Sequence, residues 1–354
     1  MSRLIEEFRE RAEGIWGNEL IAERVFYDSL LNMRGLSLVL GHYGTGKTVA
    51  GRYIVNATRG RELSVHIMLR EVGRSAERVC GGGSFWSTVL YYVYNPVSPR
   101  GHAVYANYKP GLLSPPSGDR PEECLKNLID QVERGNRLNI IIDEFDRLDE
   151  LYADEFRARS DMARVFYDLA PIVRGSEGKL RVYILAAKEF SGPILQVLDS
   201  RGFSFDHVRG GVFEIQQNMS KLEYINYLSK ICQYYNFNCD RAQVERVADF
   251  ASRADVRLWT IVSKIMRVVE ENLEALGCGD LDCVRERHAK LDLHALLPEV
   301  EMMHRLKSQY WLRELSRRAA VTSTDVQKAV EILYSDIVSA LRARGFERRT
   351  EEDK

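Results

Sequence analysis

The sequence lacks any uninterrupted apolar run of about 18 residues, the length that a membrane-spanning helix needs. It also lacks an excess of either charge, because 50 Lys and Arg residues stand against 51 Asp and Glu residues. Residues 1–16 are acidic and amphipathic, so they do not form an apolar targeting segment. These absences exclude a membrane-spanning protein and a chain attracted as a whole to nucleic acid. We expect a cytoplasmic protein with no membrane partner.

Cysteine is sparse, with six residues in 354: Cys80, Cys124, Cys232, Cys239, Cys278 and Cys283. Such thiols stay reduced in an ordinary cytosol, although hyperthermophile cytosols are an exception. Cys278 and Cys283 could close a small disulfide loop, stay free, or bind zinc together with His288 and His294. The last spacing is longer than that of a usual zinc site, so buried or paired thiols are favoured over a metal.

Short apolar runs alternate with segments of helical periodicity in the first part of the chain. The runs of strand length are 36–40, 63–69, 180–190, 211–215 and the beginning of 138–150. Such continuous apolar runs are typical of parallel strands that are buried on both faces. The alternation predicts an α/β fold with a mostly parallel five-stranded sheet between helices.

The pattern of predicted elements divides the chain into two domains. Residues 1–216 form the α/β domain, and its segment 95–121 holds most of the nine prolines, which predicts an irregular insertion. The strand signals stop after Ile215, so 217–354 is expected to form a helical domain. Its first helix opens with the capping box Ser220-x-x-Glu223. The apolar stripe of that helix is predicted to consist of Leu222, Ile225, Leu228, Ile231 and Cys232.

A glycine-rich loop, in the stretch VLGHYGTGKTVAG at 39–51, follows the first predicted strand and precedes a helix. It fits the pattern G-x-x-x-x-G-K-[ST], in which backbone amides and the helix N-terminus cradle phosphate oxygens. Lys47 is expected to reach the outer phosphates, and the Thr48 hydroxyl is expected to bind Mg²⁺. The residues predicted to contact the nucleotide are Gly41, His42, Tyr43, Gly44, Thr45, Gly46, Lys47, Thr48 and Val49.

Two carboxylates follow the apolar run that begins at 138. Asp143 comes at the carboxyl end of this strand, where open α/β sheets bind ligands, and is expected to hold Mg²⁺ with Thr48. Glu144 is next to it and is expected to orient and deprotonate an attacking water. The pair favours hydrolysis of a nucleotide over phosphate transfer to a small molecule. The sequence therefore predicts an ATPase with ATP or ADP and Mg²⁺ as its ligands.

The order of these parts, a phosphate loop, an Asp-Glu strand, a further strand and a helical bundle, resembles an AAA+ ATPase. Within that superfamily the chain looks most like the archaeal origin-recognition and replication-initiator group of loaders. The resemblance covers about residues 15–335 and rests on IIIDEFDRLDE, ADVRLWTIVSKI (254–265) and VTSTDVQKAVEIL (321–333). It implies a nucleotide-controlled hydrolase that self-associates and acts on DNA or on a DNA-bound partner.

Two arginines receive roles from this resemblance alone. Arg257 would contact the outer phosphates from the helical lid domain. Arg201, with Arg209 as the alternative, would serve a neighbouring subunit as the arginine finger that stabilises charge on the leaving phosphate.

The sequence also departs from the family pattern. Ala186 and Ala187 stand where the family has a small polar first sensor, which implies slow turnover unless Lys188 substitutes for it. The lid carries an apparent insertion at 273–320. The segment 334–354 is shorter than the roughly 40 residues that a domain needs, so no C-terminal winged-helix domain is expected.

Two alternatives to a DNA-directed ATPase follow from the same sequence. One is a slow, signalling-type switch ATPase that recruits protein through 95–121 or the lid insertion. The other is a remodeller of protein assemblies that does not bind DNA. Basic clusters at 313–320 and 342–349 are either solvated helix faces or contacts to nucleic-acid phosphates.

Overall fold

The computed structural model describes residues 3–42, 44–74, 79–80, 84–132, 136–215 and 219–253, with the separate positions 267, 270, 275–278, 283 and 286–287. Several predicted features lie outside these residues: Tyr43, Arg257, the segment 321–333, both basic clusters, and most of the insertion 273–320.

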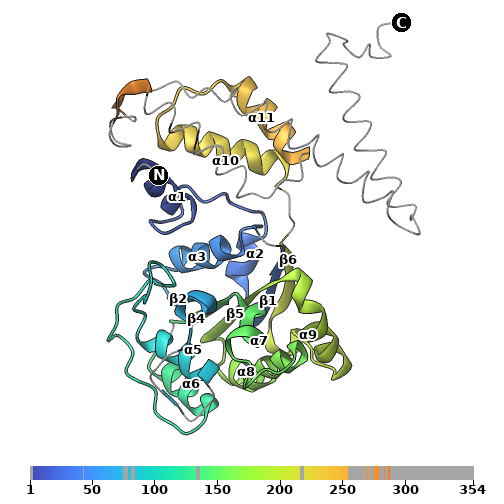
Figure 1. Ribbon diagram of the computed structural model, residues 1–354. Helices are drawn as coiled ribbons and strands as arrows, with labels where there is room; N and C mark the ends of the chain where they lie inside the picture. Colours follow the sequence, from blue (N-terminus) through green and yellow to red (C-terminus); the bar gives the residue numbers. More distant parts are fainter. Residues whose placement is uncertain are drawn as a thin grey trace, which may run out of the picture.

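A single six-stranded sheet forms the centre of the fold, with the strand order β3-β2-β4-β5-β1-β6 (Figure 1). The strands are β1 Leu36–Gly41, β2 Leu63–Met68, β3 Val104–Ala106, β4 Leu138–Asp143, β5 Leu180–Ala187 and β6 Gly211–Ile215. All neighbours are parallel except β2 and β3. The α/β class and the mostly parallel sheet are therefore confirmed.

The sheet has one strand more than the five predicted. The extra strand, β3, lies in the segment 95–121, where an irregular insertion was expected, so that expectation was wrong for Val104–Ala106. β3 pairs antiparallel with β2 at the sheet edge, where His66 lies opposite Tyr105. Only three residues long, it falls between prolines and leaves no periodic signal in the sequence.

Helices cover both faces of the sheet. The helices among the described residues are α1 Arg3–Ala12, α2 Tyr27–Asn32, α3 Lys47–Ala57, α4 Leu69–Val72, α5 Ser84–Tyr94, α6 Pro121–Asp130, α7 Leu148–Leu151, α8 Ala163–Gly175, α9 Lys188–Ser200, α10 Lys221–Tyr234 and α11 Arg241–Arg253. Helices α2 and α3 lie on one face, and α5, α6, α8 and α9 lie on the other (Figure 1). Parallel strands need such cover because both of their faces are apolar.

The amino-terminal segment packs against the helices that follow the sheet. Phe8, Ala12 and Leu20 belong to the same buried apolar cluster as residues of α10 and α11. Figure 1 shows α1 beside α10, above α3. Arg24 also donates to Glu223 at 3.2 Å, which ties the chain before α2 to the start of α10. The segment thus connects the sheet domain to the helices, and the domain limits at 216 and 217 stay a prediction.

Helix α10 begins as the sequence predicts, and it buries three residues of the predicted stripe, Leu228, Ile231 and Cys232. Ser220 Oγ accepts from the Glu223 amide at 3.2 Å, and Glu223 accepts from the Ser220 amide at 2.7 Å, so the capping box is confirmed. Leu222, predicted to lie in the apolar stripe, is 66% exposed. The buried face also includes Tyr224 and Tyr227, whose aromatic rings supply large apolar surfaces.

All six cysteines are paired, as Cys80–Cys124, Cys232–Cys239 and Cys278–Cys283. The last pair is the small disulfide loop that was one of the sequence alternatives. It leaves no thiolate for the zinc alternative at these two positions, and the two histidines of that alternative lie outside the described residues.

The disulfides are expected to stabilise the fold to different extents. Cys80–Cys124 spans 44 residues and Cys232–Cys239 spans 7, and a longer loop loses more entropy when it is closed in the unfolded chain. Replacing both cysteines by serine should cost about 4 kcal/mol for the first pair and about 2.5 kcal/mol for the second. Urea unfolding without reductant measures both costs. Equal costs would show that loop closure does not govern them.

Candidate active site

The phosphate loop lies between the carboxyl end of β1 and the first turn of α3. Gly44 and Gly46 have φ values of 79° and 93°, a left-handed conformation that residues with a Cβ rarely adopt. The Thr45 hydroxyl donates to the His42 carbonyl at 2.9 Å and holds the loop closed on itself. The loop therefore leads directly to the positive N-terminus of α3, an arrangement suited to an anion.

Lys47, the first residue of α3, turns back over this loop. Its Nζ donates to the Gly41 carbonyl at 2.7 Å and to the His42 carbonyl at 3.1 Å. Burial lowers the pKa of Lys47, while the nearby carboxylates, Asp143 first among them, oppose that shift. A phosphate group would add negative charge beside the buried ammonium and would stabilise its protonated form.

Asp143 ends β4 as predicted and is 1% exposed. Its Oδ1 accepts from the Glu144 amide at 2.8 Å, and its Oδ2 lies 3.1 Å from His66 Nε2. Burial opposes ionisation, but the hydrogen bonds from His66, the Thr48 hydroxyl and the Glu144 amide outweigh it. The pKa of Asp143 therefore lies below its usual range.

Glu144 follows at a turn with φ 59°, an unusual conformation for a residue other than glycine. The short helical turn Phe145–Arg147 follows directly. Burial first, and then the charge of Asp143, raise the pKa of Glu144 to about 7. Within the described part of the chain its buried Oε2 has no hydrogen-bond partner. A carboxylate in this state is suited to accept a proton from a bound water.

The donor set fits Mg²⁺. Thr48 and Asp143 offer a hydroxyl and an ionised carboxylate, joined by a hydrogen bond. Magnesium prefers oxygen ligands and usually keeps several waters and substrate phosphates, so it does not need a cage of protein side chains. Accordingly, no group of three His, Cys, Asp or Glu with metal-binding geometry occurs among the described residues.

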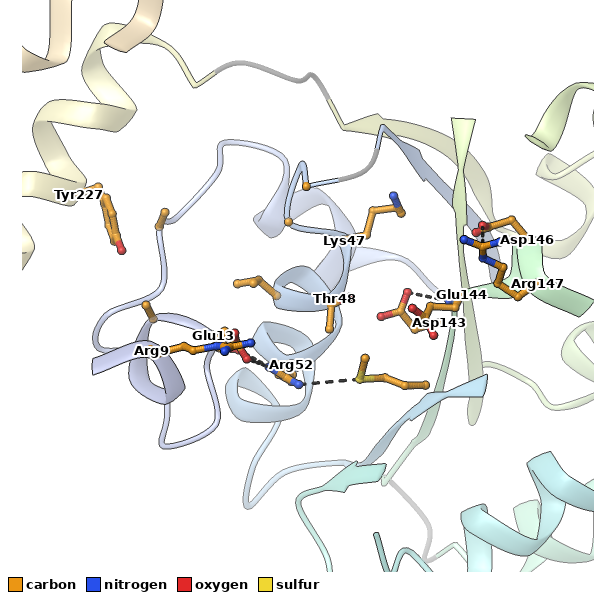
Figure 2. Close-up of a pocket in the computed structure, with 16 residues that line it drawn as sticks. Arg9, Glu13, Lys47, Thr48, Arg52, Asp143, Glu144, Asp146, Arg147 and Tyr227 are labelled. Carbon is orange, nitrogen blue, oxygen red and sulfur yellow. Dashed lines mark hydrogen bonds and ion pairs between the residues drawn. The ribbon is translucent and has the colours of Figure 1, made fainter. Parts of the chain in front are cut away.

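A cavity of about 340 Å³ opens beside these groups (Figure 2). Gly44, Gly46, Lys47, Thr48 and Val49 line it from the loop and α3, and Asp143 and Glu144 line it from the end of β4. The opposite wall comes from the amino-terminal segment and α10, through Arg9, Ala12, Glu13, Ala22 and Tyr227. The cavity thus lies between the sheet, the N-terminal segment and the first lid helix.

Three of the predicted loop residues do not line the cavity. The Gly41 and His42 carbonyls accept from Lys47, and the His42 ring pairs with Glu189. Thr45 is buried and holds the loop. These residues shape the loop around the cavity, and direct contact with a nucleotide stays a prediction for them.

Of the remaining predicted residues, those that the structure describes are not brought into the cavity. Arg201, at the C-terminal end of α9, and Arg209 are both exposed and do not line it. Ala186 and Ala187 are fully buried at the end of β5. Lys188 pairs with Glu214 of β6, so it does not replace the missing polar sensor in this structure.

The structure adds site residues that the sequence reasoning missed. Asp146 and Arg147 line the cavity, and Asp146 Oδ1 accepts from the Ala187 amide at 2.8 Å, which joins the exit of β4 to the end of β5. Arg52 lies one turn beyond Thr48 on α3 and pairs with Glu13 at 3.0 Å. Arg52 follows Thr48 by four residues, which places the two on the same face of a helix, and this spacing was the one signal in the sequence that could have identified Arg52.

Replacing the Glu144 carboxylate is expected to stabilise the free protein at high pH. Its folded-state pKa of about 7 lies above the ordinary value of 4.5, so its contribution to stability is complete below pH 4.5. That contribution is lost as the pH rises through about 7. Glu144→Gln should therefore have a higher Tm than the wild type at pH 8 and the same Tm at pH 4.5. Calorimetry without metal or nucleotide, with exposed Glu150→Gln as the control, checks this. A Tm difference independent of pH would contradict it.

Comparison with known families agrees with this geometry. Residues 31–188 match the family model of the AAA domain. The match spans the phosphate loop, Asp143, Glu144 and β5, and it supports an AAA+ ATPase with a P-loop NTPase fold. No curated protein matches the sequence. The described residues include no helix with the length and apolar character needed to cross a membrane.

Three solved structures are examples of those similar to the chain. The Walker-type ATPase PABY2304 of Pyrococcus abyssi has 16% identity and a TM-score of 0.43, covering 90% of each chain. The ORC2 protein of Aeropyrum pernix has 16% identity and a TM-score of 0.39, covering 100% of this chain and 85% of its own. Domain III of the Thermotoga maritima replication initiation protein DnaA has 12% identity and a TM-score of 0.37, covering 73% and 85%. At these identities and scores the likenesses carry no argument about function.

Proposed function

We propose that the chain is a Mg²⁺-dependent AAA+ ATPase whose nucleotide state controls its conformation and which acts on DNA or on a DNA-bound partner. The observation that supports this best is the grouping of Lys47, Asp143 and Glu144 around one cavity. The loop provides an anion site, and the carboxylate with the raised pKa provides a base. The DNA-directed role rests on the resemblance of the sequence motifs to the archaeal initiator group.

Each residue has a distinct part in the proposed hydrolysis. The loop amides and Lys47 would bind the β- and γ-phosphates, and Thr48 and Asp143 would hold Mg²⁺, which would neutralise charge that develops on the phosphates. Glu144 would orient a water and take its proton as the water attacks the γ-phosphorus, while the bond from that phosphorus to the β–γ bridging oxygen breaks and ADP leaves. Arg257 from the lid and Arg201 from a neighbouring subunit are proposed to contact the same phosphates, as the resemblance implies.

The contacts of the N-terminal segment favour coupling between nucleotide and lid. Tyr227 of α10 lines the same cavity as Lys47. Lys230 of α10 donates to the carbonyls of Asn18 and Ile21, each at 3.3 Å, next to Ala22 in the cavity wall. A nucleotide that enters this cavity would therefore contact both the sheet domain and the lid, and we propose that it sets the angle between them and so controls self-association.

A slow, signalling-type switch is the second candidate function. It is favoured by the buried Ala186 and Ala187 and by the pairing of Lys188 with Glu214, because no polar side chain from these positions orients the attacking water. Such a protein would hold ATP tightly and turn it over slowly.

ATPase assays with and without duplex or single-stranded DNA, at low and moderate salt, separate the two. DNA stimulation that falls with salt supports the DNA-directed function, because phosphate contacts are salt-sensitive. Tightly retained nucleotide without stimulation supports the switch and overturns the DNA role. Glu144→Gln is the control for contaminating activity.

A further inference from the structure

A histidine lies in the middle of the apolar strand β2, beneath helix α3. His66 is 0% exposed and pairs in register with Ile141 of β4. The next in-register pair on the same face is Met68 and Asp143. Above it, α3 has Gly51, where an added Cβ would approach the His66 ring to within 2.8 Å. The fold therefore leaves room for an imidazole at this position by using a residue without a side chain.

Asp143 is the one hydrogen-bond partner found for His66 among the described residues. Nε2 donates to Asp143 Oδ2 at 3.1 Å, while the buried Nδ1 has no partner within the described part of the chain. A buried polar atom without a partner costs about 1–3 kcal/mol, a cost that leucine in the same place would avoid. Packing alone therefore does not account for a histidine here.

The main chain holds only one oxygen of the Asp143 carboxylate, and the hydrogen bond from His66 holds the other. The Glu144 amide binds Oδ1 at 2.8 Å, and His66 binds Oδ2. Hydrogen bonds to both oxygens restrain the carboxylate against rotation about its terminal bond while it also accepts a hydrogen bond from Thr48. Groups that fix a metal-binding side chain in this way tune the affinity of the metal site.

From this geometry we propose that His66 is a positioning residue, which orients Asp143 for Mg²⁺ and thereby sets the metal dependence of nucleotide binding. The inference rests on the proposed function, since it concerns the same cavity. In this proposal His66 acts only through Asp143 and does not itself contact the nucleotide or the metal.

The test compares ADP affinity with Mg²⁺ and with EDTA by calorimetry. His66→Leu keeps the volume of the side chain but removes the donor. It should weaken ADP binding about 10- to 100-fold in Mg²⁺ and leave the affinity in EDTA unchanged. His66→Gln, whose amide can donate to Asp143, should recover part of the loss and serves if the leucine variant does not fold. Ile141→Val, beneath the same Gly51, is the matched packing control and should match the wild type in both buffers.

The outcomes separate the inference from the proposed function. A loss of ADP affinity in Mg²⁺ but not in EDTA supports the role of His66. Unchanged affinity in Mg²⁺, or equal losses with Mg²⁺ and with EDTA, would overturn the role of His66 while leaving the ATPase intact. Wild-type affinity that does not depend on Mg²⁺ at all would instead contradict the proposed Mg²⁺-dependent function and, with it, the inference.

Discussion

Glu144→Gln protein is expected to bind ATP at least as tightly as the wild type and to hydrolyse it about 10²- to 10⁴-fold more slowly. Glutamine keeps the size of the side chain and removes the base. The environment of Glu144 supports this role, because burial and Asp143 raise its pKa to about 7. The substitution also removes a negative charge from the cavity, so binding of an anionic nucleotide should not suffer. Single-turnover hydrolysis and equilibrium ATP binding measure the two effects separately.

Glu150→Gln provides the comparison, because Glu150 is an exposed acid in the same segment that pairs with Arg147 and does not line the cavity. It should leave turnover close to that of the wild type. If Glu144→Gln turned over as fast as the wild type, another group would have to take the proton, and Glu144 would lose its assigned role.

Lys47→Ala is expected to weaken ATP binding by about 10- to 100-fold for each charge-assisted hydrogen bond lost, equivalent to about 1.5–3 kcal/mol. Lys47 is positioned for this because its ammonium lies over the loop, held by the Gly41 and His42 carbonyls at 2.7 and 3.1 Å. A γ-phosphate would replace those neutral acceptors with charged ones. Fluorescence titration with a labelled ATP analogue gives the affinity of each variant.

Lys188→Ala is the matched control, since Lys188 is a lysine in the first turn of another helix that pairs with Glu214. Its removal changes the net charge of the protein by the same amount as Lys47→Ala. Equal losses in the two variants would indicate an effect of overall charge, and the assignment of the phosphate site to the loop would then be wrong.

The sheet could be predicted from sequence wherever a strand is buried on both faces. The runs that became β1 and β4 are apolar apart from Ser37, Asn139 and the terminal Asp143, and the structure buries every residue of both strands. β3 could not be predicted in this way, because it is a three-residue edge strand held by its partner β2. The predicted apolar stripe of α10 was wrong at Leu222, because two tyrosines, which periodicity arguments treat as ambiguous, lie on the buried face.

The phosphate and metal residues could be predicted because their motifs are local. Lys47 and Thr48 follow one loop, and Asp143 and Glu144 follow one strand. His66 and Tyr227 could not be predicted, because their proximity to the site depends on strand register and on the way the N-terminal segment packs against α10. His66 left one trace in the sequence, because it is a titratable residue inside a strand that is apolar apart from Ser64.

The crystal structure of the protein with Mg²⁺ and a non-hydrolysable ATP analogue tests the central claim most directly. We predict the outer phosphates within hydrogen-bond distance of Lys47 Nζ, the metal beside Thr48 and Asp143, and the base in the cavity wall near Ala22 and Tyr227. Nucleotide bound elsewhere, or a phosphate loop without an anion at saturating analogue, would contradict the account.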